Sequence, residues 1–183
     1  EIALAQAYFA VQTRRQELIE QRFAEIQRLQ ARHSLSDSEK QLSGIAFKRG
    51  VDSKGFAIIK SKGDEALFGG RSTADMKRQL GVPKSAALAD RLADVLIKAK
   101  DLTNSMTAFN AEEHDLYGLD QIKQERVENN TSVRGSLIDR GIVPENLPPA
   151  EDTKKLERRV KADEKKLKEG TDGFTDPQGR LDL

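Results

Sequence analysis

The chain has 183 residues, which is the size of one domain and is long enough to bury a hydrophobic core. Its 31 basic and 30 acidic residues nearly cancel, which excludes a global attraction to a polyanion and leaves only local patches for nucleic-acid contact. The chain contains no cysteine, which excludes a disulfide framework, a thiol nucleophile and a cysteine-based zinc site.

The first 33 residues predict one long helix. Apolar residues and two glutamines recur there at spacings of three and four, which makes one continuous stripe along a helix. The members of this stripe are Ile2, Ala5, Phe9, Gln12, Gln16, Ile19, Phe23 and Ile26. A rod of about 45 Å is long for an opening element, and no start signal precedes it. We therefore expect that it continues from a missing N-terminal domain.

Capping residues predict where the next helices begin. Ser36 and Glu39 have the spacing of a capping box, which would open a helix that stops near Gly50. The apolar run GFAII is too short for its periodicity to separate helix from strand. We expect a helix, because no second β-rich run is present to pair with it. Ser72 and Asp75 form another capping box and predict a further helix.

The middle of the chain predicts three more helices. A long amphipathic helix is expected from Ser85. Its apolar face consists of Leu88, Leu92, Val95, Leu96, Ala99, Leu102 and Met106. The run NAEE at 110–113 would cap a short helix that ends near Gly118, and Asp120 would cap a helix that runs to about Arg140.

The connector VPENLPPAED is expected to be extended, because a residue that precedes proline is pushed out of the helical region. A charged helix follows, with Glu151 and Asp152 in its first turn and lysines in its last, as the helix dipole favours. The lysines are Lys165, Lys166 and Lys168. Gly170 is expected to close this helix.

Together these elements predict an all-α fold, an irregular bundle of about six to seven helices in a single domain over residues 1–170. Residues 171–183 show no periodicity and are expected to form a flexible polar tail. No stretch approaches 18 consecutive apolar residues, and no charged-then-apolar leader opens the chain. We therefore expect a soluble, cytoplasmic protein.

The sequence predicts neither a metal site nor an active site. His33 and His114 are the only histidines, and neither has a second ligand at metal-binding spacing. The run GDEALFGGRST resembles a phosphate-binding loop, but five residues separate Gly63 from Gly69 where a P-loop has four. An arginine also stands where the P-loop lysine belongs. We expect a protein that is not an enzyme and that needs no cofactor.

Residues 71–100 are the candidate nucleic-acid contact. They hold seven basic and three acidic residues, whereas residues 111–128 hold six acidic and two basic ones. A basic surface of this kind can face phosphates without reading bases. Arg71, beside the helix that starts at Thr73, could also hold a phosphate. The seven basic candidates are Arg71, Lys77, Arg78, Lys84, Arg91, Lys98 and Lys100.

The stretch GGRSTADMKRQLGVPKSAALAD, residues 69–90, has two interpretations. Two short helices joined by a turn that contains Gly81 are typical of a helix-turn-helix, whose second helix reads base edges. Against this, the second helix offers Ala86, Ala87 and Asp90 where long polar readers belong. A packed helical corner and a sequence-specific regulator of the phage antirepressor type both stay open.

Several motifs resemble the bacterial DNA-damage-inducible protein D family. They are AYFAVQTRRQEL, FAII followed by ALFGG, GGRSTADMKRQLGVPKSAALADRL, and VENNTSVRGSLIDRGIVPENLPPAEDTKKLERRV. The resemblance covers nearly the whole chain up to about Lys168, and it brings no catalytic residues. It implies a role in the SOS response to DNA damage, acting on the recombinase filament that forms on single-stranded DNA. It also implies a front domain similar to the Bro-N domains of phage and viral proteins, which this chain lacks.

The first helix also raises the question of self-association. Gln12 and Gln16 interrupt its stripe where a monomeric core would prefer aliphatic residues, and buried glutamines can pair across a two-fold axis. A second, weak stripe of Leu156, Val160 and Leu167 lies on the charged last helix. Monomer and dimer both stay open, and a homodimer would use the first helix. A structural assembly protein that does not bind DNA is the third functional class.

Overall fold

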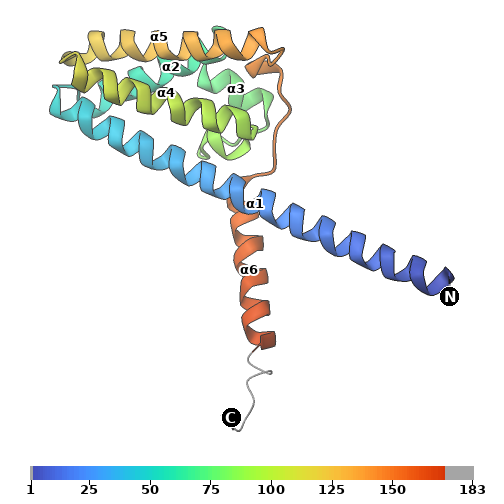
Figure 1. The fold of residues 1–183 in the computed structure, drawn as a ribbon. Helices are drawn as coiled ribbons and strands as arrows, with labels where there is room; N and C mark the ends of the chain where they lie inside the picture. Colours follow the sequence, from blue (N-terminus) through green and yellow to red (C-terminus); the bar gives the residue numbers. More distant parts are fainter. Residues whose placement is uncertain (1, 172–183) are drawn as a thin grey trace.

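The computed structural model describes the backbone of residues 2–171 and the side chains of residues 6–166. In these residues it has six α-helices and no strand, so the predicted all-α fold is confirmed (Figure 1). The helices are α1 (Ile2–Lys48), α2 (Ser53–Leu67), α3 (Thr73–Gln79), α4 (Asp94–Glu113), α5 (Gly118–Asp139) and α6 (Thr153–Thr171). Two 3-10 turns span Leu88–Arg91 and Pro144–Asn146. The predicted tail lies outside the described residues except for Thr171, because α6 runs past Gly170.

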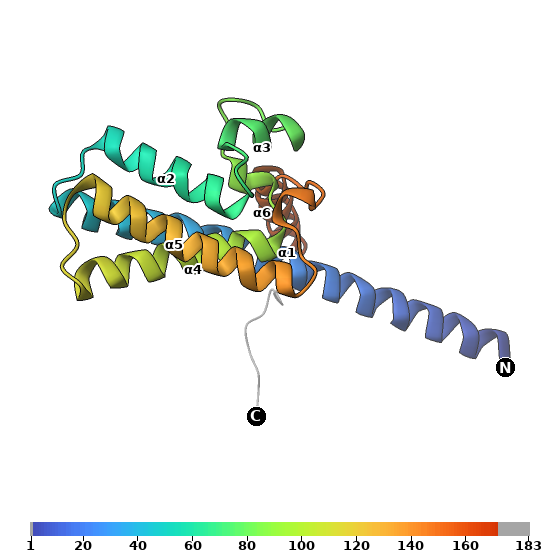
Figure 2. The same cartoon turned by 90° about the horizontal axis from the view of Figure 1, so that it is seen from above.

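Helices α1, α2, α4 and α5 form the body of the molecule (Figures 1 and 2). α4 packs along the second half of α1, and α5 packs along α2 and contacts α4. α3 and the first 3-10 turn lie at the end of the body near the start of α6. The main core gathers there from α1, α2, α3, the first 3-10 turn and α4. Its fully buried members are Leu35, Leu67, Phe68, Met76, Leu92, Leu96 and Ile97.

α1 is one continuous helix where the sequence predicted two. Residues 33–36 contain neither glycine nor proline, and Leu35 is buried in the main core, so the helix passes straight through the predicted break. Ser36 therefore caps nothing. Ser38 donates a hydrogen bond to the carbonyl of Leu35 (3.1 Å) within the same helix. The predicted stop near Gly50 is confirmed, since Gly50 adopts φ +82° just after the helix.

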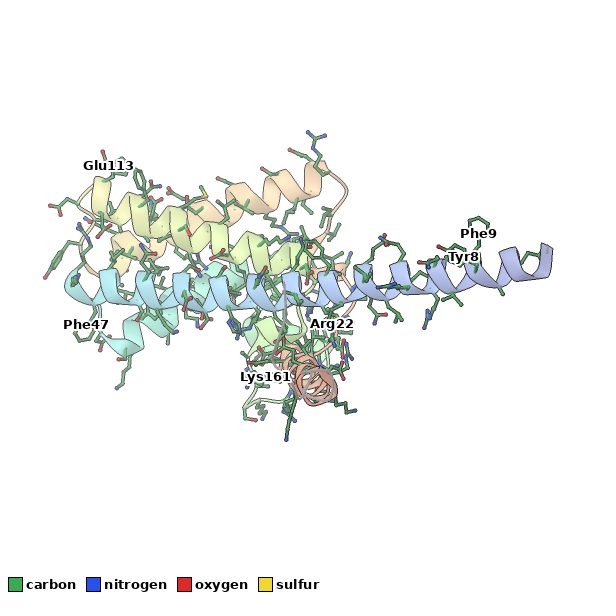
Figure 3. The ribbon with its side chains drawn as sticks, turned by 60° about the horizontal axis from the view of Figure 1, so that its bottom comes forward. Tyr8, Phe9, Arg22, Phe47, Glu113 and Lys161 are labelled. Carbon is green, nitrogen blue, oxygen red and sulfur yellow. The ribbon has the colours of Figure 1, made fainter. Side chains whose placement is uncertain are left out.

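The first part of α1 projects beyond the body as a single helix, and we call residues 6–23 the arm (Figures 1 and 2). The described members of the predicted stripe on the arm are open to water, and Phe9 is 68% exposed. Figure 3 shows Tyr8 and Phe9 far from every other element. The exposed apolar side chains of the arm are Tyr8, Phe9, Val11, Leu18, Ile19 and Phe23.

The long helix predicted from Ser85 is wrong at its start. After α3 the chain turns, forms the 3-10 turn Leu88–Arg91, and begins α4 only at Asp94. Leu88 is buried in the main core, while Asp90 is buried on another side and accepts a hydrogen bond from Arg32 of α1 (2.9 Å). Tertiary contacts on two sides thus override the local helical pattern.

The predicted apolar face of α4 is wrong at Val95 and Leu102, which are 36% and 52% exposed. The buried face of α4 contains four polar residues among nine, and these hydrogen-bond to α1, α2 and α5. It consists of Leu96, Ile97, Ala99, Lys100, Thr103, Asn104, Thr107, Ala108 and Ala111. The run 110–113 ends α4 instead of capping a new helix, and Asp120 lies in the first turn of α5 instead of preceding it.

α6 begins at Thr153, so Glu151 and Asp152 precede the helix instead of forming its first turn. The carboxylate of Asp152 accepts hydrogen bonds from the backbone amides of Lys154 (2.9 Å) and Lys155 (3.3 Å), as a capping residue does. Two members of the weak stripe are buried where α6 meets α1 and the first 3-10 turn. They are Leu156 and Val160. The side chain of the third member, Leu167, lies outside the described ones.

Candidate nucleic-acid interface

The start of α3 forms the capping box that the sequence predicts. The hydroxyl of Ser72 accepts a hydrogen bond from the amide of Asp75 (3.1 Å), and the Asp75 carboxylate accepts one from the amide of Ser72 (3.2 Å). The pKa of Asp75 is lowered, first by the hydrogen bond from the Ser72 hydroxyl and then by that from Arg78. Gly81 at φ +64° ends the following turn. This local geometry fixes the direction in which α3 presents its basic side chains.

Three of the seven basic candidates come together beside α3. Lys77, Arg78 and Lys84 line one surface hollow of about 620 Å³, together with the side chain of Val82. The ammonium group of Lys77 donates a hydrogen bond to the backbone carbonyl of Lys84 (3.0 Å). We call Lys77, Arg78 and Lys84 the basic hollow. Arg71 lies nearby and donates to Gln79 at the end of α3.

The other three candidates lie apart from the basic hollow. Lys98 is exposed on α4. Arg91 is half-buried, with its Nε 3.9 Å from a carboxylate oxygen of Asp152. Lys100 is only 5% exposed and forms an ion pair with Asp64 of α2. Lys100 therefore cannot belong to a phosphate-facing surface, because its charge is already neutralised inside the protein.

The predicted phosphate site at Arg71 and Thr73 is not assembled. The Thr73 hydroxyl donates a hydrogen bond to the carboxylate of Asp64 (3.0 Å), and Asp75 occupies the first turn of α3. The Thr73 hydroxyl and the Ser72 amide at this helix start are therefore already bound to carboxylates of the chain itself.

The helix-turn-helix interpretation fails on geometry. It requires a second helix directly after the turn, with its first residues facing a groove. The chain instead makes a 3-10 turn that buries Leu88, Ala89 and Asp90. The corner is packed into the core, as the alternative interpretation predicted. No recognition helix follows α3 in the described structure before α4 starts at Asp94.

His33 and His114 are exposed and lie on different elements, His33 in the interior of α1 and His114 just after α4. Among the residues that the structure describes, no three histidine, aspartate or glutamate side chains form a group able to hold a metal ion. In the same part of the chain, no helix is both long enough and apolar enough to cross a membrane.

A buried polar layer between α2, α4 and α5 was not found by sequence reasoning. The guanidinium of Arg126 donates a hydrogen bond to the hydroxyl of Thr103 (2.9 Å), which itself donates to the Asn130 side chain (3.2 Å). Asn129 donates to Thr107 (3.1 Å). The available signal was the run of small polar residues at helical spacing on both helices, which a search for apolar stripes passes over.

Arg126 is the centre of this layer and is 2% exposed. Burial lowers the pKa of its guanidinium to about 10, while the charges of Asp64 and Glu39 act in the opposite direction. It lies directly against Gly63 of α2, where an added Cβ would stand 2.8 Å from the Arg126 Nε. Gly63, which the sequence places in a run that resembles a phosphate-binding loop, is therefore a contact point inside a helix.

A second structural contact connects α2, α5 and the proline-rich connector. Arg134 of α5 donates to both carboxylate oxygens of Glu145 (2.6 and 2.8 Å) and to the backbone carbonyl of Leu67 (2.8 Å). These hydrogen bonds raise the pKa of Arg134 and lower that of Glu145. Gly69 allows the close approach, because an added Cβ would lie 2.7 Å from the guanidinium. The VRGSLIDRGIVPEN motif thus holds the fold together.

The chain matches the family model described as "DinD C-terminal domain" over residues 23–156. It is also similar to "DNA damage-inducible protein D" of Escherichia coli (strain K12), with 31% identity over 173 residues. The similar region is 90% of this chain and 63% of the E. coli protein, so the chain spans less than two thirds of that relative's length. The family match includes α3, the buried polar layer and the Arg134–Glu145 contact, and it begins where the arm ends.

Proposed function

The chain belongs to the DinD family, and from this premise we propose that it acts in the response to DNA damage as a binding protein rather than an enzyme. The name of the E. coli relative supports the first part of this proposal. The second part is supported by the partners of the buried charged groups: Lys100 and Asp64 form an ion pair with each other, and Arg126 donates a hydrogen bond to Thr103, so these charges are already bound within the protein.

We further propose that the basic hollow contacts a nucleic-acid backbone. The observation that carries this proposal is the clustering of Lys77, Arg78 and Lys84 around one open surface hollow. Within the described residues Lys77 and Lys84 form no ion pair, so their charges are available to phosphates. Contact with the backbone gives affinity without base readout, which agrees with the absence of a helix able to enter a groove after α3.

The finer proposal for the partner is a recombinase filament on single-stranded DNA. It rests on the family resemblance of the sequence motifs, and the basic hollow gives it a physical point of contact. Addition of the chain to a preformed filament, followed by fluorescence of a labelled single strand, tests it. We expect the chain to change the stability of the filament. A filament that assembles and dissociates at unchanged rates contradicts the proposal.

The nucleic-acid contact is tested by two matched double variants. Lys77→Glu with Lys84→Glu alters the basic hollow. Lys48→Glu with Lys54→Glu makes the same charge change on exposed lysines at the opposite end of the body. Fluorescence anisotropy with a labelled single strand, over a range of salt concentrations, measures affinity for each protein.

We expect weak binding by the wild type that falls steeply with salt, because phosphate contacts release counterions. The hollow variant should lose affinity, and its slope of log affinity against log salt should fall by about 1.4, or about 0.7 for each lost contact. The control variant should stay close to the wild type. Equal losses in both variants would show a general charge effect and contradict the assignment to the basic hollow.

A further inference from the structure

The stripe on the arm has the spacing of a coiled coil. From Ile2 to Ile26 its members alternate between steps of three and four residues without exception, which is a strict heptad repeat. In this register Phe9, Gln16 and Phe23 occupy a positions. Gln12, Ile19 and Ile26 occupy d positions. A period of 3.5 residues along a free helix is the pattern that a second helix covers by supercoiling.

The described body of the protein does not use this stripe. Phe9 and Phe23 are 68% and 61% exposed, and Ile19 is 55% exposed. The stripe ends at Ile26, which lines the hollow of about 650 Å³ between α1 and α6. The next two positions of the repeat are Gln30 and His33, both polar, in the same hollow. The apolar seam is thus confined to the segment that projects from the body (Figure 3).

The charges beside the stripe indicate what covers it. Arg15 and Arg22 occupy g positions, and Glu20 occupies an e position of the following heptad. In a parallel pair, Arg15 of one helix would face Glu20 of the other, because g pairs with the next e. Within the described residues Arg15 has no partner of its own, and Glu20 accepts only from Gln16 (2.9 Å). In an antiparallel pair the g positions would face each other and bring arginines together.

We propose that two copies of this chain associate through their arms as a parallel, in-register, two-stranded coiled coil over residues 9–26. In a pair of identical arms the ion pair between Arg15 and Glu20 forms twice, once on each side of the seam. It also places Gln12 opposite Gln12 and Gln16 opposite Gln16, where amide side chains can hydrogen-bond to each other and fix the register. A parallel pair leaves both bodies at the same end of the seam.

The proposed seam is short and contains two polar layers, so its affinity is modest. Eighteen residues give about 27 Å of helix, or about two and a half heptads. We expect dimers at concentrations of about 100 µM and dissociation on dilution to about 1 µM. The proposal does not depend on nucleic-acid binding, and its tests use the full 183-residue chain without DNA.

Disulfide crosslinking tests orientation and register directly, because the chain has no cysteine of its own. Gln12→Cys places one thiol from each helix in the seam, and mild oxidation should convert most of the protein into a covalent dimer. Arg14→Cys places the thiol on the outer face of the same helix turn and should stay monomeric under the same conditions. An antiparallel pair would instead crosslink Gln12→Cys with Phe23→Cys in a mixture of the two proteins, and that outcome overturns the proposal.

Light scattering tests association without crosslinking. The wild type at 100 µM should approach twice the 20.4 kDa of one chain. Phe23→Glu puts a charge into the seam and should raise the dissociation constant at least about 100-fold. Gln21→Glu, on the exposed outer face, should change it less than about threefold. A wild-type mass of one chain at 100 µM, or a dimer that tolerates Phe23→Glu, overturns the proposal.

Discussion

Gly63 and Gly135 are both helical glycines, and their surroundings differ completely. An added Cβ at Gly63 would meet Arg126 at 2.8 and 2.9 Å, whereas one at Gly135 would meet nothing within 4 Å. Helix propensity favours alanine at both sites by about 0.5–1 kcal/mol. Arg126 is only 2% exposed and forms hydrogen bonds, so at Gly63 we expect the steric cost to outweigh this gain.

We therefore predict opposite signs for the same substitution. Gly135→Ala should raise the free energy of unfolding by about 0.5–1 kcal/mol, because it only reduces the freedom of the unfolded chain. Gly63→Ala should lower the free energy of unfolding by about 1–3 kcal/mol, because it overpacks the contact with Arg126. Urea denaturation followed by circular dichroism measures both. Stabilisation by Gly63→Ala would mean that α2 and α5 are less tightly packed than their contact indicates.

Asp64 provides the second prediction at this scale. Its carboxylate is the partner of buried Lys100, and it also lowers the electrostatic cost of burying Arg126 nearby. Asp64→Asn removes the negative charge and should lower the free energy of unfolding by about 3–5 kcal/mol. Asp37→Asn breaks an exposed pair with Lys40 and should cost less than about 1 kcal/mol. Similar losses in the two variants would show that the Asp64–Lys100 pair is hydrated.

At the scale of elements, the Arg134–Glu145 contact determines how the connector returns to the body. One guanidinium reaches both carboxylate oxygens of Glu145 and the last carbonyl of α2, so it joins three segments of the chain. Arg134→Lys keeps the charge but loses the planar fork. We expect this change to lower the free energy of unfolding by about 1–3 kcal/mol in a thermal or urea melt at pH 7.

The same contact predicts a dependence on pH. Arg134 holds the pKa of Glu145 below its ordinary value, so the folded state binds the proton of this carboxyl less readily than the unfolded state does. The stabilisation is complete above the unfolded pKa, about 4.3, and is lost as the pH falls through the lower folded pKa. Glu145→Gln should therefore lower the free energy of unfolding at pH 7. The difference in this free energy between the variant and the wild type should shrink steadily below about pH 4. A difference that stays constant down to pH 2 would contradict this assignment.

Local patterns predicted those elements that local contacts determine. The capping box at Ser72 and Asp75 is satisfied within one turn, so the sequence alone was sufficient. Ser36 and Glu39 show the same spacing, but they lie inside α1 because Leu35 belongs to the core. The sequence contains no local sign of that long-range contact. The all-α class was predictable from periodicity, whereas the break before α4 was not, because distant partners of Asp90 hold that segment.

The candidate site was predictable only in part for the same reason. The count of charges over residues 71–100 included Lys77, Arg78 and Lys84, which line one surface hollow. It also included Lys100, because its partner Asp64 lies on another helix, 36 residues earlier. The buried polar layer of Thr103, Arg126 and Asn130 was missed because such side chains usually indicate a solvated face.

At the scale of the whole molecule, the structure has two parts of different character. The body and the neighbouring α3 enclose the core, whereas the arm has exposed side chains and ends where α6 crosses α1. Arg22 marks this crossing through its ion pair with Asp163 of α6 (2.7 Å), and Lys161 lies on the same helix (Figure 3). The stability of the body should thus be independent of the arm.

Removal of residues 1–17 tests this independence. At about 1 µM, where the proposed pairing is absent, the shortened chain should unfold within about 2 °C of the wild type, because the described residues 6–17 are all exposed. At about 100 µM the wild type should gain stability that the shortened chain does not, since association favours the folded state. A large loss of stability at the lower concentration would show that the arm packs against the body.

The unbroken helix α1 affects how a paired molecule can bind a nucleic-acid strand. No glycine or proline interrupts the helix between the arm and Leu42, which is buried in the body, so the molecule has no joint at which its two parts could swivel. In a paired molecule, the two basic hollows would be held at a fixed separation and a fixed angle. Whether both hollows can bind one strand at the same time then depends on geometry alone. A rigid connection either matches the spacing of two binding sites on the strand or prevents the second hollow from binding.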